Sequence, residues 1–466
     1  MAATSTRRTR RMLLHVAAGG AGAVLAACGM AGSTGTGAGR QQPQGMARPA
    51  GKLAIMSRAD PYIHDLFKEQ VKAFTAEHPE VQIEIDHQEQ SAWLEKFKTM
   101  VASASPLDSA FANDSNAVLF AKDGLTQDLE PYFATQRDFK EADFFEGAWF
   151  AMKYQGKRYG LPWDSGAYAL YYNMDLLDNA GVPYPDTKKR LTWDELLTMA
   201  RRLTLDAHDR RPNEGGFDPT QVKQYGFSTS LTWGLANFVF SNGGEMLTAD
   251  GKVPLDQAPA IEAIQFLADL RSKHFVWQAP QFTPPQAIGF RTNNLAIDHN
   301  GAWQIGRFAT DVKRVGVAPA PMKQHAVSGG HYSPLVMTRH SQNKDTCWAW
   351  MYFACLSERG QTILSDAGQM QPMRKSLAQR FLNAPGGKIE ARYRQVFLDE
   401  LQHSGLRVTG DKMGTYWGGY PGWGPTLTPL LTPVWRGEKS ASSVASDLRR
   451  FTEQYLQTGQ APVITP

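Results

Sequence analysis

Cysteine is scarce in this chain: its 466 residues include three, and only Cys347 and Cys355 lie beyond residue 28. The two stand eight residues apart in TCWAWMYFACLS, a stretch typical of a helix. At 1.5 Å per residue they would be roughly 12 Å apart, which is too far for a disulfide bond. We therefore predict a fold without disulfides, in which these two side chains are part of the core.

Acidic residues are absent from positions 1–27, which contain four arginines. The run Leu13–Ala27 is apolar except for His15, but a membrane-spanning helix needs about 20 apolar residues. A basic start followed by a short apolar run and small residues is typical of a secretory signal. No later run is long enough to span a membrane. Without residues 1–27 the chain has 45 basic and 45 acidic residues, so its charge does not indicate a nucleic-acid partner.

Motifs of phosphate-binding loops and zinc proteases are absent, and the 11 histidines are scattered. We expect no metal and no cofactor. Ser341–Lys344 matches S-x-x-K but lacks its companion motifs, so we interpret it as chance. An exported glycoside hydrolase would need two paired carboxylates. Asp164, Glu245 and Asp298 are available, but nothing in the sequence pairs them.

The segment before Cys28 resembles a bacterial lipobox, Leu25-Ala26-Ala27-Cys28. This resemblance implies cleavage before Cys28 and a lipid on its thiol, with an ordinary signal and a chance cysteine as the alternative. Thr9–Leu14 is similar to a twin-arginine export motif, although Leu13 stands where phenylalanine is usual. The Gly- and Ser-rich residues that follow are typical of a flexible linker. We predict a signal over 1–27, a tether over 28–50 and a protein anchored to the outer face of the cell membrane or periplasmic.

About 415 residues follow the tether, which suits two or more domains. Leu53–Arg58 is typical of a buried strand, and Val81–Asp86 alternates like a half-buried one. Between them, apolar residues recur at helical spacing: Ile63, Phe67, Val71 and Phe74. Strand, helix and strand in this order predict an α/β fold with a mostly parallel sheet.

A second α/β block begins near Gly166. Tyr168–Asn173 is strand-like, and Thr192–Glu195 has the pattern of a capping box that opens a helix. Another helix is expected from Pro259. Arg314–Pro321 is expected to be a strand that runs into a proline-rich loop.

Several stretches together resemble the maltose-binding-protein-like solute-binding proteins of ABC importers. In chain order they are GLPWDSGAYALYYNMDLLDNAGV, PDTKKRLTWDEL, GFSTSLTWGLANFVFSNGGEML, FRTNNLAIDHNGAWQIG, VAPAP, the helix from Asp345 and LTPVWRGEKSASSVASDL. No single stretch is specific to the family, but together, and in the family's order, they extend over most of residues 51–455.

The resemblance implies a type II periplasmic-binding-protein fold: two lobes with parallel-rich sheets flanked by helices, joined by a hinge that the chain crosses several times. We expect lobe 1 over 51–164 plus 322–357 and lobe 2 over 165–319 plus 366–466. The implied protein is a monomeric extracytoplasmic receptor, not an enzyme, that captures an oligosaccharide or sugar-like polyol for a membrane permease. An anionic ligand such as a glycerol phosphate is the alternative within binding proteins, and a carbohydrate-cleaving lipoprotein is the alternative among enzymes.

Recognition of a sugar needs aromatic faces for its C–H surface and planar polar groups for its hydroxyls. The segments that the resemblance places between the lobes supply both kinds of residue. The predicted ligand-binding residues are Ser57, Arg58, Asn113, Asp114, Asp164, Trp233, Asn300, Trp303, Gly330, Tyr332, Arg374 and Trp417.

Trp233 and Trp303 are favoured for stacking, and Trp163 lies in the same segments. For each tryptophan the alternative is core packing, and for each polar residue it is a turn or a cap. Arg374 would favour an anionic ligand if it entered the site, because arginine binds carboxylates and phosphates bidentately.

Overall fold

A computed structural model of the chain describes residues 48–58, 61–89, 92–145, 149, 152–231, 233–248, 250–278, 288–329, 331–403 and 427–458. All of them belong to one compact unit, Gly45–Pro466. Cys28, the predicted signal and nearly all of the predicted tether lie outside the described residues.

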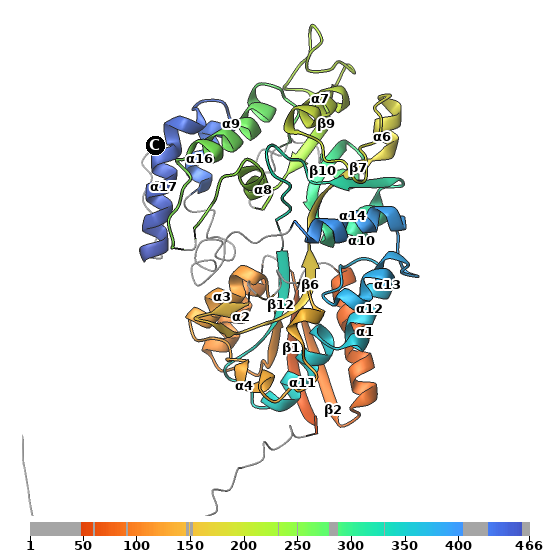
Figure 1. Ribbon diagram of the computed structural model, residues 1–466, viewed down its shortest axis with the longest axis vertical. Helices are drawn as coiled ribbons and strands as arrows, with labels where there is room; N and C mark the ends of the chain where they lie inside the picture. The colour runs from red at the N-terminus through yellow and green to blue at the C-terminus, as the bar shows by residue number, and fades with distance from the viewer. Residues whose placement is uncertain are drawn as a thin grey trace, which may run out of the picture. The chain divides into compact units, whose positions relative to one another are not determined.

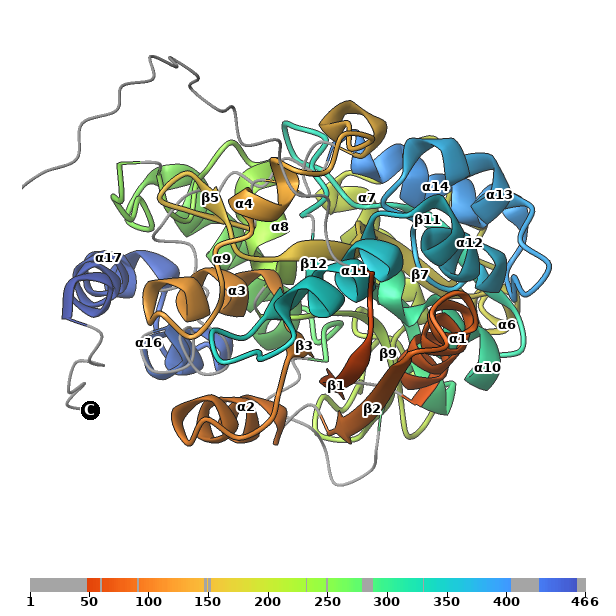
Figure 2. The ribbon, with the colours of Figure 1, turned by 90° about the horizontal axis from the view of Figure 1, so that it is seen from below.

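The first of two five-stranded sheets carries the N-terminal strands (Figure 1). Its order is β2 (Val81–Gln88), β1 (Gly51–Arg58), β3 (Ser109–Phe111), β12 (His331–Met337) and β6 (Leu161–Gly166). The helix α1 (Pro61–Glu77) connects β1 to β2, which are parallel, as the strand–helix–strand order predicts. Helix α1 lies beside these two strands in Figure 1 and Figure 2.

The second sheet is built from the middle of the chain. Its order is β11 (Val315–Pro319), β7 (Tyr168–Asn173), β10 (Leu295–Gly301), β9 (Val222–Thr229) and β8 (Leu205–Asp206). A separate hairpin pairs β4 (Lys153–Tyr154) with β5 (Lys157–Arg158). The strands predicted at Tyr168–Asn173 and near Arg314–Pro321 are confirmed.

The sheets are mixed rather than mostly parallel. β1 is parallel to β2 and β3, and β9 is parallel to β10, whereas β7 and β12 are antiparallel to their neighbours. The difference arises where the chain passes between the sheets. The passage from β6 to β7 occurs at Ala167, and β12 returns to the first sheet from β11 in the opposite direction.

Helices cover both faces of the first sheet because alternate side chains of a strand point to opposite sides. Leu53 and Ile55 of β1 belong to the core cluster that includes α1 and α11, whereas Met56 belongs to a cluster formed with α2 and α3. The described helices beside this sheet are α1, α2 (Trp93–Ala102), α3 (Asp114–Lys122), α4 (Glu130–Phe133), α11 (Lys344–Cys355) and α12 (Glu358–Ala367).

The remaining described helices belong to the second sheet and the C-terminal region. They are α6 (Met174–Asn179), α7 (Trp193–Leu203), α8 (Trp233–Ser241), α9 (Ala258–Ser272), α10 (Ile305–Asp311), α13 (Ala378–Leu382), α14 (Ala391–Leu401), α16 (Leu427–Trp435) and α17 (Ala441–Thr458). Thr192 and Glu195 form the predicted capping box of α7. Helix α12 packs on α1 and α11, so the last passage between the sheets follows α12. The division into lobes stays a prediction at that boundary.

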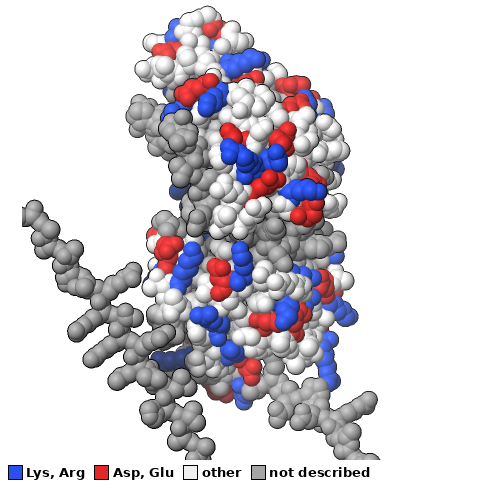
Figure 3. Space-filling model, turned by 90° about the vertical axis from the view of Figure 1, so that its left-hand side faces the viewer, with Lys and Arg blue, Asp and Glu red and all other residues white. Residues whose placement is uncertain are grey.

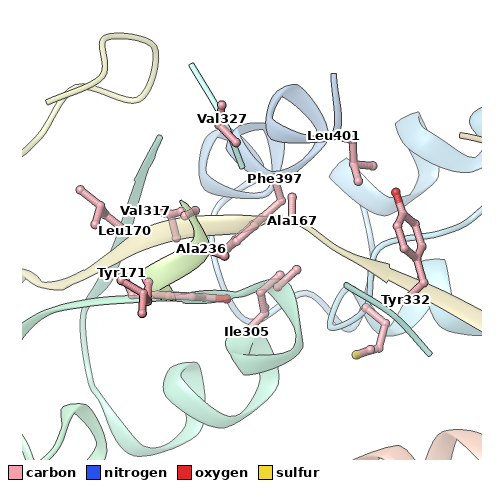
Figure 4. Packing of buried hydrophobic residues seen from close by; sticks show 14 of the residues in the cluster. Ala167, Leu170, Tyr171, Ala236, Ile305, Val317, Val327, Tyr332, Phe397 and Leu401 are labelled. Carbon is pink, nitrogen blue, oxygen red and sulfur yellow. The ribbon is translucent and has the colours of Figure 1, made fainter. Parts of the chain in front are cut away.

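One hydrophobic cluster runs through both sheets. It includes Tyr332 of β12 and Tyr171 of β7 (Figure 4). Cys347 and Cys355 are buried free thiols on α11, as predicted. Acidic and basic side chains are interspersed on the face seen in Figure 3. No helix in the described part of the chain is long and apolar enough to cross a membrane.

Candidate functional site

The end of β1 places Arg58 in a buried box of aromatic rings. Its guanidinium lies 5.2 Å from the ring centre of Trp93 and 4.9 Å from that of Phe111, and Nη2 donates to the carbonyl of Ala112 at 3.0 Å. Burial lowers the pKa of Arg58 to about 10, although the charges of Asp164 and Asp114 oppose that effect. At neutral pH the guanidinium therefore remains a cation.

Asp114 and Asp164 also fix the strand β12. Asp164 accepts a hydrogen bond from the backbone N–H of Ser333 at 2.9 Å, and Asp114 accepts one from the N–H of Tyr332 at 3.3 Å. All three ionic side chains are almost fully buried. Burying a charge without a partner is costly, so the cation and the two carboxylates stabilise one another.

Ser57 and Asn113 have local structural partners. The Ser57 hydroxyl is buried within hydrogen-bonding distance of the Nδ1 atoms of His64 and His87, at 3.3 Å and 3.0 Å. Asn113 is the N-cap of α3 and accepts from the N–H of Asn116 at 2.7 Å. This is the capping alternative given for Asn113 above, and it leaves the amide partly exposed.

Tyr168, the first residue of β7 in the second sheet, lies within electrostatic range of Asp114. It follows directly after the passage between the sheets, and its hydroxyl lies 3.4 Å from the hydroxyl of Ser230. Burial raises the pKa of Tyr168 well above its ordinary value, and the charges of Asp298 on β10 and Asp114 on α3 add to the rise. The phenol is therefore neutral at physiological pH.

Trp303 rests against this tyrosine. The two rings meet edge to face, with centres 5.3 Å apart at 79°. A Cβ at Gly301 would overlap the six-membered ring of Trp303, so the glycine provides the space in which the indole lies. Among the predicted site residues that the structure describes, Trp303, Asn113, Asn300 and Arg374 are partly exposed. Trp303 is the aromatic one of these four and can therefore offer a ring face to a ligand.

Strand β10 contributes two buried titratable groups beside Trp303. Asp298 accepts a hydrogen bond from the amide of Asn300 at 3.2 Å, and the other end of that amide accepts from the N–H of Gly301 at 2.9 Å. Burial raises the pKa of Asp298 to about 7. Burial lowers the pKa of His299 to about 3, and its Nδ1 lies 2.9 Å from the hydroxyl of Thr229.

We expect Asp298→Asn to remove a pH dependence of stability. In the folded protein the Asp298 carboxyl keeps its proton up to about pH 7, whereas in the unfolded chain it loses it near 3.8. The folded state thus binds more protons in this window, and the free energy of unfolding falls as the pH rises through it, by a few kcal/mol on the order-of-magnitude scale of such shifts. Denaturant titrations between pH 4 and 8 should show the variant gaining relative stability as the pH rises; parallel curves would contradict this.

Arg374 is held by contacts with segments that pack beside the first sheet. Its Nη1 donates to the carbonyl of Leu356 at 2.6 Å, Nη2 lies 3.6 Å from Asp143, and the guanidinium lies 5.0 Å from the ring centre of Phe144. None of these contacts brings it to Arg58 or Trp303. Tyr332 is fully buried in the core cluster.

Of the remaining predicted residues, one is buried in the core, and the side chains of the others lie outside the described residues. Trp163 is a core residue, since its indole N–H donates to Gln70 at 2.7 Å and its ring stacks on Phe67 at 4.8 Å. Trp233 begins α8, but its side chain lies outside the described residues, as do Gly330 and Trp417.

Four residues around Trp303 and Asp298 are not among the site residues predicted from the sequence: Tyr168, Ser230, His299 and Gly301. Tyr168 was expected only as a strand residue and Gly301 only as a neighbour of Asn300. The signal that could have identified Tyr168 is its place two residues after Gly166, where the chain passes between the sheets. Among the described residues no three His, Cys, Asp or Glu side chains could hold a metal ion together.

Known proteins resemble this chain in sequence and in fold. A Brucella abortus protein described as a binding protein is 24% identical over 295 residues, which are 62% of this chain and 67% of that protein. An arabinooligosaccharide-binding protein of Halalkalibacterium halodurans is 24% identical over 222 residues, 45% of this chain and 46% of its own. The solved ABC substrate-binding protein of Listeria monocytogenes in complex with cycloalternan superposes with a TM-score of 0.74 at 20% identity, over 87% of this chain and 99% of that one.

The likeness in fold confirms the two-lobed α/β architecture expected from the resemblance. The profile of a protein family matches residues 69–388, which include most of both sheets and the residues around Trp303. The chain therefore belongs to the bacterial extracellular solute-binding proteins.

Proposed function

We propose that this protein is the extracytoplasmic substrate-binding receptor of an ABC importer and that it captures a carbohydrate, an oligosaccharide or a sugar-like polyol. The observation that carries the proposal is the partly exposed Trp303 indole, seated over Gly301 beside Tyr168, in a member of the extracellular solute-binding family. An aromatic face with polar groups around it suits the C–H face and hydroxyl edge of a sugar ring.

The charges near the candidate site favour a neutral ligand. Arg58 is matched by the charges of Asp164 and Asp114, and Arg374 by a carbonyl and Asp143. A cation that already faces carboxylates attracts an added anion less. An anionic ligand of the glycerol phosphate type remains the second candidate among binding functions.

The rest of the proposal concerns the oligomeric state of the receptor, its membrane anchor, its permease and the fate of its ligand. We expect a monomer that is anchored through a lipid on Cys28 and passes its ligand to the transmembrane subunits of a permease. We also expect no turnover of the ligand; the alternative from another class is an exported carbohydrate-cleaving lipoprotein. Binding energy would then shift the balance between arrangements of the two lobes rather than drive chemistry.

Thermal unfolding of the chain from Gly45 onward, against a panel of ligands, tests the proposal. The panel comprises maltotriose, lactose, arabinotriose, cycloalternan, mannitol, glycerol 3-phosphate and an amino-acid mixture. A ligand at 100 times its dissociation constant adds about 2.7 kcal/mol to the stability, which visibly raises the midpoint. We expect a rise with a neutral saccharide or polyol that is recovered intact by chromatography.

Three outcomes would contradict parts of this proposal. A rise with glycerol 3-phosphate alone would favour the anionic ligand, and cleavage of the saccharide would favour the enzyme. A rise with amino acids alone would contradict the carbohydrate class.

A further inference from the structure

Tyr62, on a helix that packs against the first sheet, contacts the segment of Trp303, whose indole ring is called the aromatic platform below. Helix α1 packs on β1, β2 and α12. The hydroxyl of Tyr62, in its first turn, donates a hydrogen bond to the carbonyl oxygen of Trp303 and lies 3.8 Å from the sulfur of Met370. Met370 follows α12, where the chain leaves the first sheet for the last time. A single phenol thus contacts both the platform and the last passage between the sheets.

The Trp303 segment is fixed from several directions at once. The N–H of Ala302 donates to the carbonyl of Ala167, at the passage between β6 and β7, at 3.0 Å. Tyr168 borders the indole edge to face, and Gly301 leaves room beneath it. Of these contacts, the one with Tyr62 comes from α1, so it makes the place of Trp303 depend on that helix.

Beside this hydrogen bond α1 and α10 are not closely packed. A cavity of about 480 Å³ lies between them and is lined by Tyr62. Asp65 and Glu69 of α1 contribute to its lining, and so do three basic residues of other segments: Arg291, Arg307 and Lys388. Because the space is open, neighbouring side chains would not replace the lost contact if the hydroxyl were removed.

We propose that Tyr62 is a positioning residue for ligand recognition: its hydroxyl holds the backbone of Trp303 and so orients the indole on which the ligand stacks. The inference rests on the proposed function, because it takes Trp303 as the ligand platform. It adds that the platform is held jointly by both sheets, so that ligand affinity depends on the position of α1. Removing the hydroxyl loosens the indole without removing a core ring.

The first test uses the protein without ligand. Acrylamide quenching of tryptophan fluorescence is measured for the wild type, Tyr62→Phe and Tyr184→Phe, each with and without Trp303→Phe, so that subtraction isolates the Trp303 signal. Tyr184→Phe is the matched control, because its hydroxyl donates to Asp178 at 2.6 Å on the surface and its other described contacts are with Arg314 and Tyr172. We expect Tyr62→Phe to raise quenching of Trp303 about twofold and Tyr184→Phe to leave it unchanged.

The second test measures affinity by calorimetry for whichever panel compound raises the unfolding midpoint most. We expect Tyr62→Phe to weaken binding about 2- to 12-fold, in line with the loss of one hydrogen bond. The same change in the Trp303→Ala background should have no further effect, because Tyr62 acts through the indole that this variant lacks.

Unchanged quenching of Trp303 in Tyr62→Phe would overturn the inference. So would equal effects of Tyr62→Phe in both backgrounds, which would indicate a general structural role. If Trp303→Ala leaves affinity unaltered, the platform in the proposed function fails, and the quenching experiment still decides whether Tyr62 holds Trp303.

Discussion

Trp303→Ala is expected to weaken ligand binding about 10- to 100-fold, which is the usual range for truncating a central aromatic anchor. The side chain is partly exposed, lies over Gly301 and contacts Tyr168 at its edge. Its removal takes away the ring face while the sheet beneath it remains. The measurement is isothermal calorimetry with the compound that the ligand panel selects.

Two further variants separate stacking from other losses. Trp303→Phe keeps an aromatic face and should retain much of the affinity. Gly301→Ala should weaken binding although Trp303 is still present, because the added methyl group displaces the indole. The backbone of Gly301 has a φ of −87°, which alanine adopts freely, so strain in the chain would not explain the effect. Wild-type affinity in Trp303→Ala would remove this residue from the site.

Arg58→Met should lower the free energy of unfolding by about 3–5 kcal/mol, the range found when one member of a buried group of opposite charges is removed. Methionine has a similar length and no charge, so the variant leaves Asp114 and Asp164 buried without the cation that acts on them. It also removes the hydrogen bond to Ala112 and the contacts with Trp93 and Phe111. Denaturant unfolding at pH 7 measures the change.

Arg314→Met is the matched control for that variant. Arg314 also contacts two carboxylates, Asp175 and Asp178, but on the surface, where 44% of its side chain is exposed. Water and salt screen such pairs, so the control should lose much less stability. Equal losses in the two variants would show that burial of the Arg58 group contributes nothing.

Local sequence patterns predicted much of the secondary structure correctly. The apolar spacing of Ile63, Phe67 and Phe74 gave α1, and the alternation in Val81–Asp86 gave β2. These elements depend on which face of a short segment avoids water, and that information is local. The order of the family-like stretches predicted the two-lobed fold, which the structural comparison confirms.

The direction of several strands could not be predicted from local sequence patterns. A strand-helix-strand pattern predicts parallel neighbours, but β12 enters the first sheet from the second and is antiparallel to β3 and β6. No residue within β12 encodes that direction, because it results from where the chain was before. The same holds for α12, whose packing on α1 sets where the chain finally leaves the first sheet.

The sequence by itself determined many of the helices and strands, the family and the residue types from which a sugar site can be built. It also predicts an export signal. Only the tertiary structure decided the surroundings of those residues: Trp163 became a core residue, Asn113 a helix cap, Arg58 a buried cation and Trp303 a partly exposed aromatic side chain, which we propose as the ligand platform. The physical reason is that exposure and partners are not properties of a residue type. They depend on side chains from distant segments, such as Tyr62 and Tyr168 around Trp303, which meet only when both sheets are in place.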